Sequence, residues 1–191
     1  MNDKYIYLDY NATTPLDERV HRAMIPYFRE SFANATSSHL FGLTVKEAIE
    51  EATDSLALSL GAKSRNIIYA SGATEALNLV IKGLAFSDKK HIVTVATEHH
   101  AVLNVCGFLE NFGYQVTYLP VDFLGIIDLE LLAEVVTDRT LLVCVMLANN
   151  ETGIIHPIKE ISKIAHENGA LMLCDATQAI GRLAVDMQDL G

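Results

Sequence analysis

The chain has 191 residues, of which 50% are hydrophobic and 20% charged, so one sizeable core is expected and a disordered or fibrous class is excluded. Its 24 acidic residues outnumber the 14 Lys and Arg, and the net charge of −10 argues against a nucleic-acid partner, which requires clustered cations. The longest apolar run, residues 141–148, is too short to span a membrane, and the polar first residues exclude a signal peptide, so a cytoplasmic location is predicted.

Short apolar runs alternate with longer helical patterns along the chain. In order, the pattern predicts a strand at 5–8, a helix from Thr14, a helix over 45–56, a strand at 67–70, a helix over 74–86, a strand at 91–96, a helix over 102–112, a strand at 116–119, a helix over 129–136, a strand at 141–147, a helix over 158–168 and a strand at 171–174. Thr14 is the expected cap of the first helix, since Pro15 suits its first turn.

Alternation of strands and helices predicts an α/β fold, with a mostly parallel sheet and helices on both faces. The strands are near-continuous apolar runs, as expected when both faces of a sheet are covered. Ligands of such sheets bind beyond the carboxyl ends of the strands, so the segments that follow each strand are the informative ones.

A small glycine-containing turn, Ser71-Gly72-Ala73-Thr74, leads into the helix predicted after residues 67–70. Backbone N–H groups at such a helix start suit a phosphate, although an ordinary capped helix start fits equally well. No Lys follows the turn as in a Walker loop, and the chain has no GxGxxG motif.

Polar residues also follow the strands at 91–96 and 141–147. His99 could stack on a planar cofactor or move protons, but a cap or surface role is the simpler interpretation. Asn149, Asn150 and Glu151 stand before Gly153, which indicates a turn that could also orient a polar ligand.

Asp175 directly ends the last predicted strand, where a buried acid is costly unless a cation meets it. The protonated pyridine nitrogen of pyridoxal 5'-phosphate (PLP) is one such cation, and Gln178 could reach the neighbouring ring oxygen. A helix-capping Asp remains an equal alternative. Three cysteines without CxxC spacing and seven histidines without HxxxH spacing predict neither a disulfide framework nor a metal site.

Five ordered motifs resemble those of the cysteine desulfurases, which belong to the class V group of fold-type-I PLP enzymes. The motifs are residues 7–15 (YLDYNATTP), 71–75 (SGATE), 97–99 (TEH), 149–151 (NNE) with Gly153, and Asp175 with Gln178. The resemblance runs from Tyr5 to the end of the chain and implies the large PLP-binding domain of that fold.

The resemblance also implies roles for individual residues. Ala73 and Thr74 would hold the cofactor phosphate, and His99 would stack on the pyridine ring and assist proton transfer as a catalytic residue.

On the other side of the cofactor, Asn150 would bond the cofactor or substrate near the ring oxygen. Asp175 would keep the pyridine nitrogen protonated, and Gln178 would bond the cofactor hydroxyl oxygen.

The reaction implied by the family takes L-cysteine, releases L-alanine and leaves the sulfur on an enzyme cysteine as a persulfide. That sulfur passes to an iron–sulfur scaffold or to another sulfur-acceptor protein for thio-cofactor assembly. Family members are normally homodimers, so a homodimer is expected of the complete enzyme, with neither nucleic acid nor membrane as a partner.

The sequence departs from the family pattern in two ways. The family's Gly-Asn-Pro-Ser-Ser stretch is Ala33-Asn34-Ala35-Thr36-Ser37 here, which loosens that loop. The Schiff-base lysine would fall just past Gly191, and the persulfide cysteine further on. The expected organisation is therefore a segment near the active site (1–15) and a partial PLP-binding domain (16–191), without the small C-terminal domain and inactive alone.

Two other functions remain open at this point. The cofactor motifs do not separate a desulfurase from a selenocysteine lyase or another class V aminotransferase. A non-catalytic, truncated interaction module is the alternative from a different class of protein.

Overall fold

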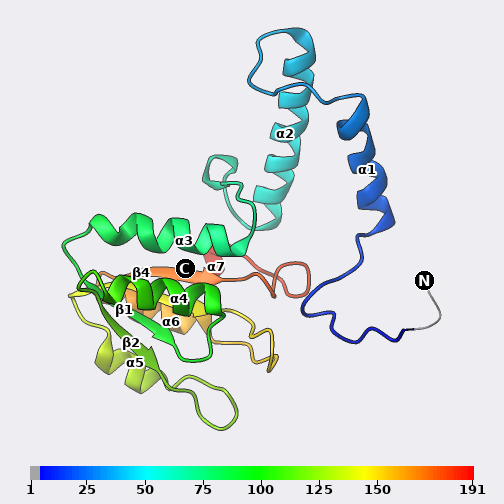
Figure 1. Cartoon of the computed structure of the whole chain (residues 1–191). Coiled ribbons are helices and arrows are strands. Elements are labelled where there is room, and N and C mark those ends of the chain that lie inside the picture. The colour runs from blue at the N-terminus through cyan, green and yellow to red at the C-terminus, as the bar shows by residue number, and fades with distance from the viewer. Residues whose placement is uncertain (1–4) are drawn as a thin grey trace. The chain divides into compact units, whose positions relative to one another are not determined.

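The computed structural model describes residues 5–191, and the chain divides between Ile68 and Tyr69 into two compact units. The N-terminal unit contains α1 (Glu18–Arg29), α2 (Leu40–Ser59) and the short 3-10 helix η1 (Ser64–Asn66). The second unit, called the sheet unit below, contains all of the strands among the described residues (Figure 1).

The first helix of the N-terminal unit starts later than predicted. Asp17, not Thr14, is the N-cap of α1, and its side chain accepts a hydrogen bond from the Arg19 N–H. A carboxylate is a strong cap because it satisfies a free N–H and also favours the positive end of the helix. The strand predicted at 5–8 is wrong, since those residues have no ladder partner and are irregular.

Helix α2 confirms the predicted helix and extends it toward the N-terminus. His39 caps it, its Nδ1 accepting from the Gly42 N–H at 3.1 Å. A Cβ on Gly42 would lie 2.6 Å from the Ser37 carbonyl oxygen, so only glycine allows the preceding loop to approach this closely. Asn34 Oδ1 holds that loop by accepting from the N–H and hydroxyl of Thr36. The loop therefore keeps an ordered turn without the glycine and proline of the family pattern.

The sheet unit confirms the predicted alternation of strands and helices. Its elements are α3 (Ala73–Gly83), η2 (Leu84–Phe86), β1 (His91–Val95), α4 (His100–Glu110), β2 (Gln115–Leu119), α5 (Leu129–Val135), β3 (Thr140–Met146), α6 (Ile158–Glu167), β4 (Leu171–Asp175) and α7 (Met187–Leu190). All strand pairs are parallel, in the order β2-β1-β3-β4. The strand predicted at 67–70 is wrong, because no described strand pairs with it.

Helices cover both faces of the sheet, as predicted. Val93, Val95 and Val143 face one side, where they pack with residues of α5 and α6. Ile92 and Leu142 face the other side, where they pack with residues of α3 and α4 (Figure 1). Successive strand residues point to opposite faces, and both faces are covered, so every residue of β1 and β3 is buried. All of these residues are apolar except His91, Thr94 and Thr140.

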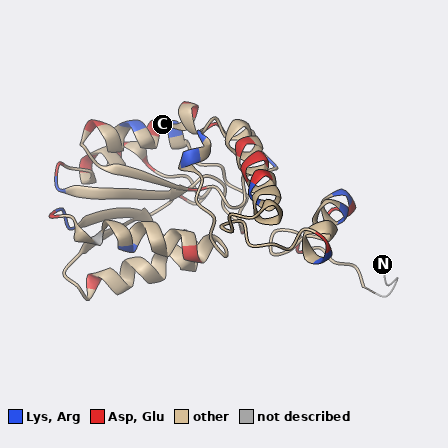
Figure 2. Cartoon of the chain, turned by 90° about the horizontal axis from the view of Figure 1, so that it is seen from above, with Lys and Arg blue, Asp and Glu red and all other residues tan. Residues whose placement is uncertain are grey.

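Charged residues are distributed over the helices and loops of the described part of the chain, with Lys and Arg interspersed among the acids (Figure 2). Helix α2 carries several of the acids. No described helix is both long and apolar enough to cross a bilayer.

Replacing a core isoleucine of α6 tests the packing of the sheet unit. Ile161 is fully buried in the cluster beneath β1 and β3, so Ile161→Ala should lower the free energy of unfolding by about 2–5 kcal/mol. The same change at Ile126, which is 44% exposed, should cost below about 1 kcal/mol. Urea denaturation measures both, and equal losses would contradict the assigned core.

Candidate cofactor site

The carboxyl ends of three neighbouring strands meet at one edge of the sheet. Met146 at the end of β3 is in register with Asp175 at the end of β4, and the Leu147 N–H donates to the Asp175 carbonyl at 2.9 Å. Strand β1 lies on the other side of β3 and runs in the same direction. The polar segments after these strands are therefore brought together, as the sequence predicts for a parallel sheet.

Asp175 is a buried acid that lacks a cation. It is 9% exposed, and its Oδ1 accepts hydrogen bonds from the N–H and hydroxyl of Thr177. Among the described residues no Lys, Arg or His forms an ion pair with it. A buried carboxylate without a cation is costly, so this site is suited to a ligand that brings a positive charge.

The start of α3 presents unpaired backbone donors. Gly72 is the N-cap and contributes no side-chain hydrogen bond, and the first bond of the helix is from the Ala76 N–H to the Gly72 carbonyl. Among the described residues, the N–H groups of Ala73 and Thr74 have no acceptor. Such a helix start favours an anion such as a phosphate.

A cavity of about 260 Å³ joins the helix start to the buried acid. Both Ala73 and Asp175 line it. Its other walls are largely apolar and come from α3, from β4 and from the segment after β4: Ala76, Leu77, Val80, Leu173, Cys174, Ala176, Thr177 and Ile180. The sheet unit thus places a helix start with unpaired N–H groups and a carboxylate without a cation around one cavity, an arrangement suited to a ligand with a phosphate and a protonated ring nitrogen.

His99 lies between β1 and α4 and is the N-cap of that helix. Its Nδ1 accepts from the Ala101 N–H at 3.1 Å, which places the proton of the neutral ring on Nε2. The ring is exposed to solvent. His99 therefore caps α4, as one of the two interpretations of the sequence predicted. Its exposed ring and Nε2 remain accessible for stacking or proton transfer.

The turn after β3 is held by Asn149 rather than by Asn150. The Asn149 side-chain amide donates to the Thr97 carbonyl at 3.0 Å, and its Oδ1 accepts from the N–H groups of Glu151 and Thr152. Asn149 is buried, whereas Asn150 is partly exposed. The position of both amides at a strand end does not distinguish them, and only the family resemblance selected Asn150.

Gln178 lies in the turn that follows β4, on the same segment as Asp175. Its Oε1 accepts from Arg182 Nη1 at 3.1 Å. Neither Gln178 nor Thr74, His99 or Asn150 lines the 260 Å³ cavity, so these residues surround the strand ends without sharing that cavity.

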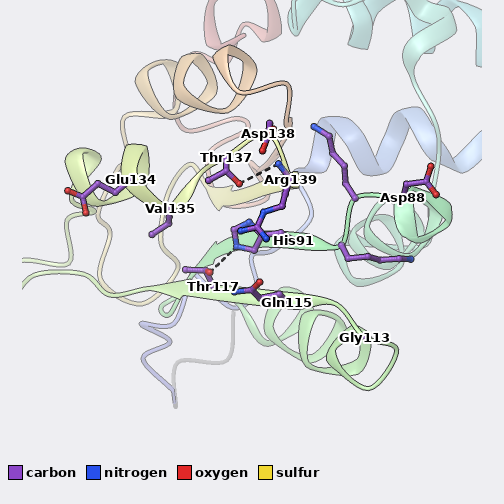
Figure 3. A pocket seen from close by; sticks show the side chains of 12 residues that line it. Asp88, His91, Gly113, Gln115, Thr117, Glu134, Val135, Thr137, Asp138 and Arg139 are labelled. Carbon is purple, nitrogen blue, oxygen red and sulfur yellow. Dashed lines mark hydrogen bonds between the residues drawn. The ribbon is translucent and has the colours of Figure 1, made fainter.

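A second cavity, of about 690 Å³, lies at the opposite end of the sheet, where β1, β2 and β3 begin (Figure 3). His91 lies there with both ring nitrogens bonded at 2.9 Å to the hydroxyls of Thr117 and Thr140. Burial, with a smaller contribution from Arg139, lowers the pKa of His91, so the ring is a neutral structural bridge. The cavity's three cations are matched by three acids: Lys89, Lys90 and Arg139 against Asp88, Glu134 and Asp138. It therefore offers no preference for a charged ligand.

Glu98 is a buried acid next to His99 that sequence reasoning did not select. It is 5% exposed, and its Oε1 accepts from the Met146 N–H at 2.8 Å. Burial raises its pKa to about 8, with a smaller contribution from the charge of Asp175. The only sequence signal was an acid three positions beyond an apolar strand.

Comparison with known families identifies the chain. The model of the aminotransferase class-V family matches residues 6–191, so the chain belongs to that family, whose members are PLP-dependent. The chain is 50% identical over 188 residues to cysteine desulfurase IscS of Rickettsia bellii (strain OSU 85-389), covering 96% of this chain and 46% of the relative. It is 48% identical over 189 residues to cysteine desulfurase IscS of Dictyoglomus turgidum (strain DSM 6724 / Z-1310), covering 97% and 48%. The chain spans about half the length of the curated relatives it matches.

Solved structures agree with this assignment and with the predicted fold-type-I architecture. A NifS-like protein superposes with a TM-score of 0.94 at 36% identity, covering 97% of this chain and 52% of that one. A structure described as SspA in complex with cysteine superposes with a TM-score of 0.93 at 38% identity, covering 96% and 54%.

An isosteric change at Asn149 tests how the turn after β3 is held. Asn149→Asp replaces the donor that faces the Thr97 carbonyl by a carboxylate oxygen, and should lower the free energy of unfolding by about 1–3 kcal/mol at neutral pH. The loss should shrink in acid, where a protonated carboxyl group regains a donor. Denaturation at pH 5 and pH 8 measures it, with Asn111→Asp at the exposed end of α4 as the matched control. A loss no larger than that of the control would refute the assigned role.

Proposed function

We propose that this chain is the cofactor-binding part of a PLP-dependent cysteine desulfurase. The observation that carries the proposal is the single cavity lined by Ala73, at the unpaired start of α3, and by Asp175, a buried acid without a cation. Support for the reaction comes from the relatives named cysteine desulfurase and from the similar structure that is described as a complex with cysteine.

The residues around that cavity would hold the two charged ends of PLP. The N–H groups of Ala73 and Thr74 would donate to the phosphate, whose negative charge is favoured at a helix start. The Asp175 carboxylate would meet the pyridine nitrogen and keep it protonated. PLP bound in this way supplies an electron sink for the bonds around the substrate α-carbon.

The other predicted site residues would orient the ring and the substrate. His99 would stack on the ring while its Nδ1 remains bonded to the Ala101 N–H, and the proton on Nε2 would be available for transfer. Asn150 and Gln178 would bond the polar groups on the ring-oxygen side, and Asn149 would fix the turn that carries Asn150.

The lysines of the sheet unit all have other partners. Lys82 lies over the Phe108 ring, Lys89 donates to the Thr140 and Gly169 carbonyls, and Lys90 donates to the Tyr114 hydroxyl. On α6, Lys159 pairs with Asp189 and Lys163 with Glu167.

The three cysteines of the chain lie in the sheet unit and are poor nucleophiles. Burial raises the pKa of Cys106 and of Cys174 to about 12, and it also raises the pKa of Cys144 well above its ordinary value. In this proposal the residues around the 260 Å³ cavity, which include no lysine, would bind and orient PLP without supplying the covalent groups.

Further features of the complete enzyme belong to the same proposal. We infer a homodimer in the cytoplasm that passes sulfur to an iron–sulfur scaffold or another acceptor protein. The division into a segment near the active site (1–15) and a partial PLP-binding domain (16–191) also remains part of the proposal.

Ala73→Pro tests the phosphate site. Proline suits the first helical position but lacks the N–H, so the helix should remain while PLP affinity falls about 10- to 100-fold through the lost charge-assisted hydrogen bond. Equilibrium dialysis measures the affinity. Pyridoxal, which lacks the phosphate, is the control ligand, and its affinity should be the same for both proteins. A parallel loss of pyridoxal binding would indicate steric blocking of the cavity instead.

The lining of the 260 Å³ cavity predicts the outcome of a turnover assay. The 191-residue protein with PLP, L-cysteine and a thiol reductant should form no more alanine or sulfide than free PLP does, since no lysine lines that cavity to carry the cofactor. Chromatography of amino acids measures alanine. Alanine formation well above the free-PLP control would contradict the proposal that these residues bind PLP without supplying the covalent groups. Turnover of selenocysteine without turnover of cysteine would favour a lyase.

A further inference from the structure

Glu98 is an acid that the proposed chemistry does not use, yet its side chain contacts the carboxyl end of β3, beside Asp175. It follows β1 directly before His99, and its Oε1 accepts from the N–H of Met146, the last residue of β3. Met146 is in register with Asp175 on β4. One side chain thus connects the segment that carries His99 to the strand beside Asp175.

The second carboxyl oxygen of Glu98 has no visible partner. Oε2 is inaccessible to solvent and accepts no hydrogen bond from any described residue. A charged oxygen in that position would lose its hydration without compensation, which is far costlier than burying a neutral carboxyl group. The geometry therefore favours the protonated form.

The titratable groups that face Glu98 do not stabilise a negative charge. They are Asp175 and Cys174 on β4, Cys144 on β3 and Cys106 on α4, none of which is a cation. Only the Met146 N–H favours the charged form, and burial outweighs it.

We propose that Glu98 is a positioning residue of the cofactor site: as a neutral carboxyl group it ties the segment that carries His99 to the end of β3, leaving Asp175 as the buried negative charge that meets the cofactor. This inference rests on the proposed function for its role toward PLP. The neutral state itself follows from burial, the single hydrogen bond and the unpaired oxygen.

Ionisation of Glu98 should loosen the site. It would place a second buried anion near Asp175, and like charges in a poorly hydrated region repel strongly. Because the pKa of Glu98 is raised in the folded state, to about 8, the folded protein holds this proton more tightly than the unfolded chain does. The stability that the proton supplies is complete below the unfolded pKa of 4.5 and is lost as the pH rises toward about 8.

Glu98→Gln separates charge from shape. The amide can still accept from the Met146 N–H, but it cannot ionise. Between pH 6 and pH 8 the unfolding equilibrium constant of the natural protein should increase by up to about tenfold per pH unit relative to that of Glu98→Gln. Glu134→Gln, a change at an exposed position of α5, should leave the natural pH dependence unchanged. Urea denaturation across this range measures all three proteins.

A carboxyl titration and PLP binding complete the test. In the natural protein labelled with ¹³C at the glutamate carboxyl, one resonance should titrate near pH 8, and Glu98→Gln should lack it. PLP affinity of the natural protein should fall more steeply above pH 8 than that of Glu98→Gln, while the two remain within a few-fold of each other at pH 7.

The possible failures are distinguishable. Parallel pH profiles of stability, with no glutamate that titrates near pH 8, would overturn the neutral state, and the resonance decides this even if Glu98→Gln does not fold. A titrating Glu98 with identical PLP pH profiles in both proteins would overturn its role at the site. Absence of PLP binding by the natural protein at every pH would instead reject the proposed function.

Discussion

Parallel pairing of β1, β3 and β4 is the constraint on which the candidate site depends. Each strand contributes a polar residue or turn directly after its last apolar residue, and the common direction of the strands brings these segments to one edge. The backbone reinforces this arrangement, because the Leu147 N–H continues the β3–β4 ladder to the Asp175 carbonyl. Helices α4 and α6 then leave the strand ends toward opposite faces, so the turns between strand and helix have defined positions.

The two buried acids at this edge of the sheet avoid the free-energy cost of an uncompensated buried negative charge in two different ways. Asp175 accepts two hydrogen bonds from Thr177 and lacks a cation, so it is suited to a positively charged ligand. Glu98 is deeper, with one hydrogen bond and one unpaired oxygen, so neutralisation by a proton is the less costly state. Two acids of similar intrinsic acidity can therefore serve opposite purposes a few residues from the same strand ends, because their surroundings differ.

Sequence patterns were sufficient to predict those strands and helix ends whose signal lies within a few neighbouring residues. The strands of the sheet unit are continuous apolar runs, and Gly113 and Gly169, both with positive φ, lie just after the ends of α4 and α6, close to the helix ends that the pattern predicts. Residues 5–8 and 67–70 carry the same kind of apolar run, but a strand requires a neighbour, which a run of residues does not reveal. Long-range contacts limit prediction at the site in the same way. The sequence did not single out Asn149 or Glu98, because each is buried against a segment distant in the sequence. Asn149 bonds the Thr97 carbonyl, and Glu98 bonds the Met146 N–H.

The N-terminal unit contrasts with the sheet unit in how little it buries by itself. Helix α1 has no buried residue, while Tyr27 and Phe28 on it are exposed, and only Gly42, Val45 and Ala57 of α2 are buried. An isolated helix of the length of α1 is marginal in water, and most helical stability in proteins comes from packing of an apolar face. Exposed aromatic and aliphatic side chains on both helices therefore indicate surfaces that gain stability when covered. The sheet unit, by contrast, has a hydrophobic core on each face of its sheet.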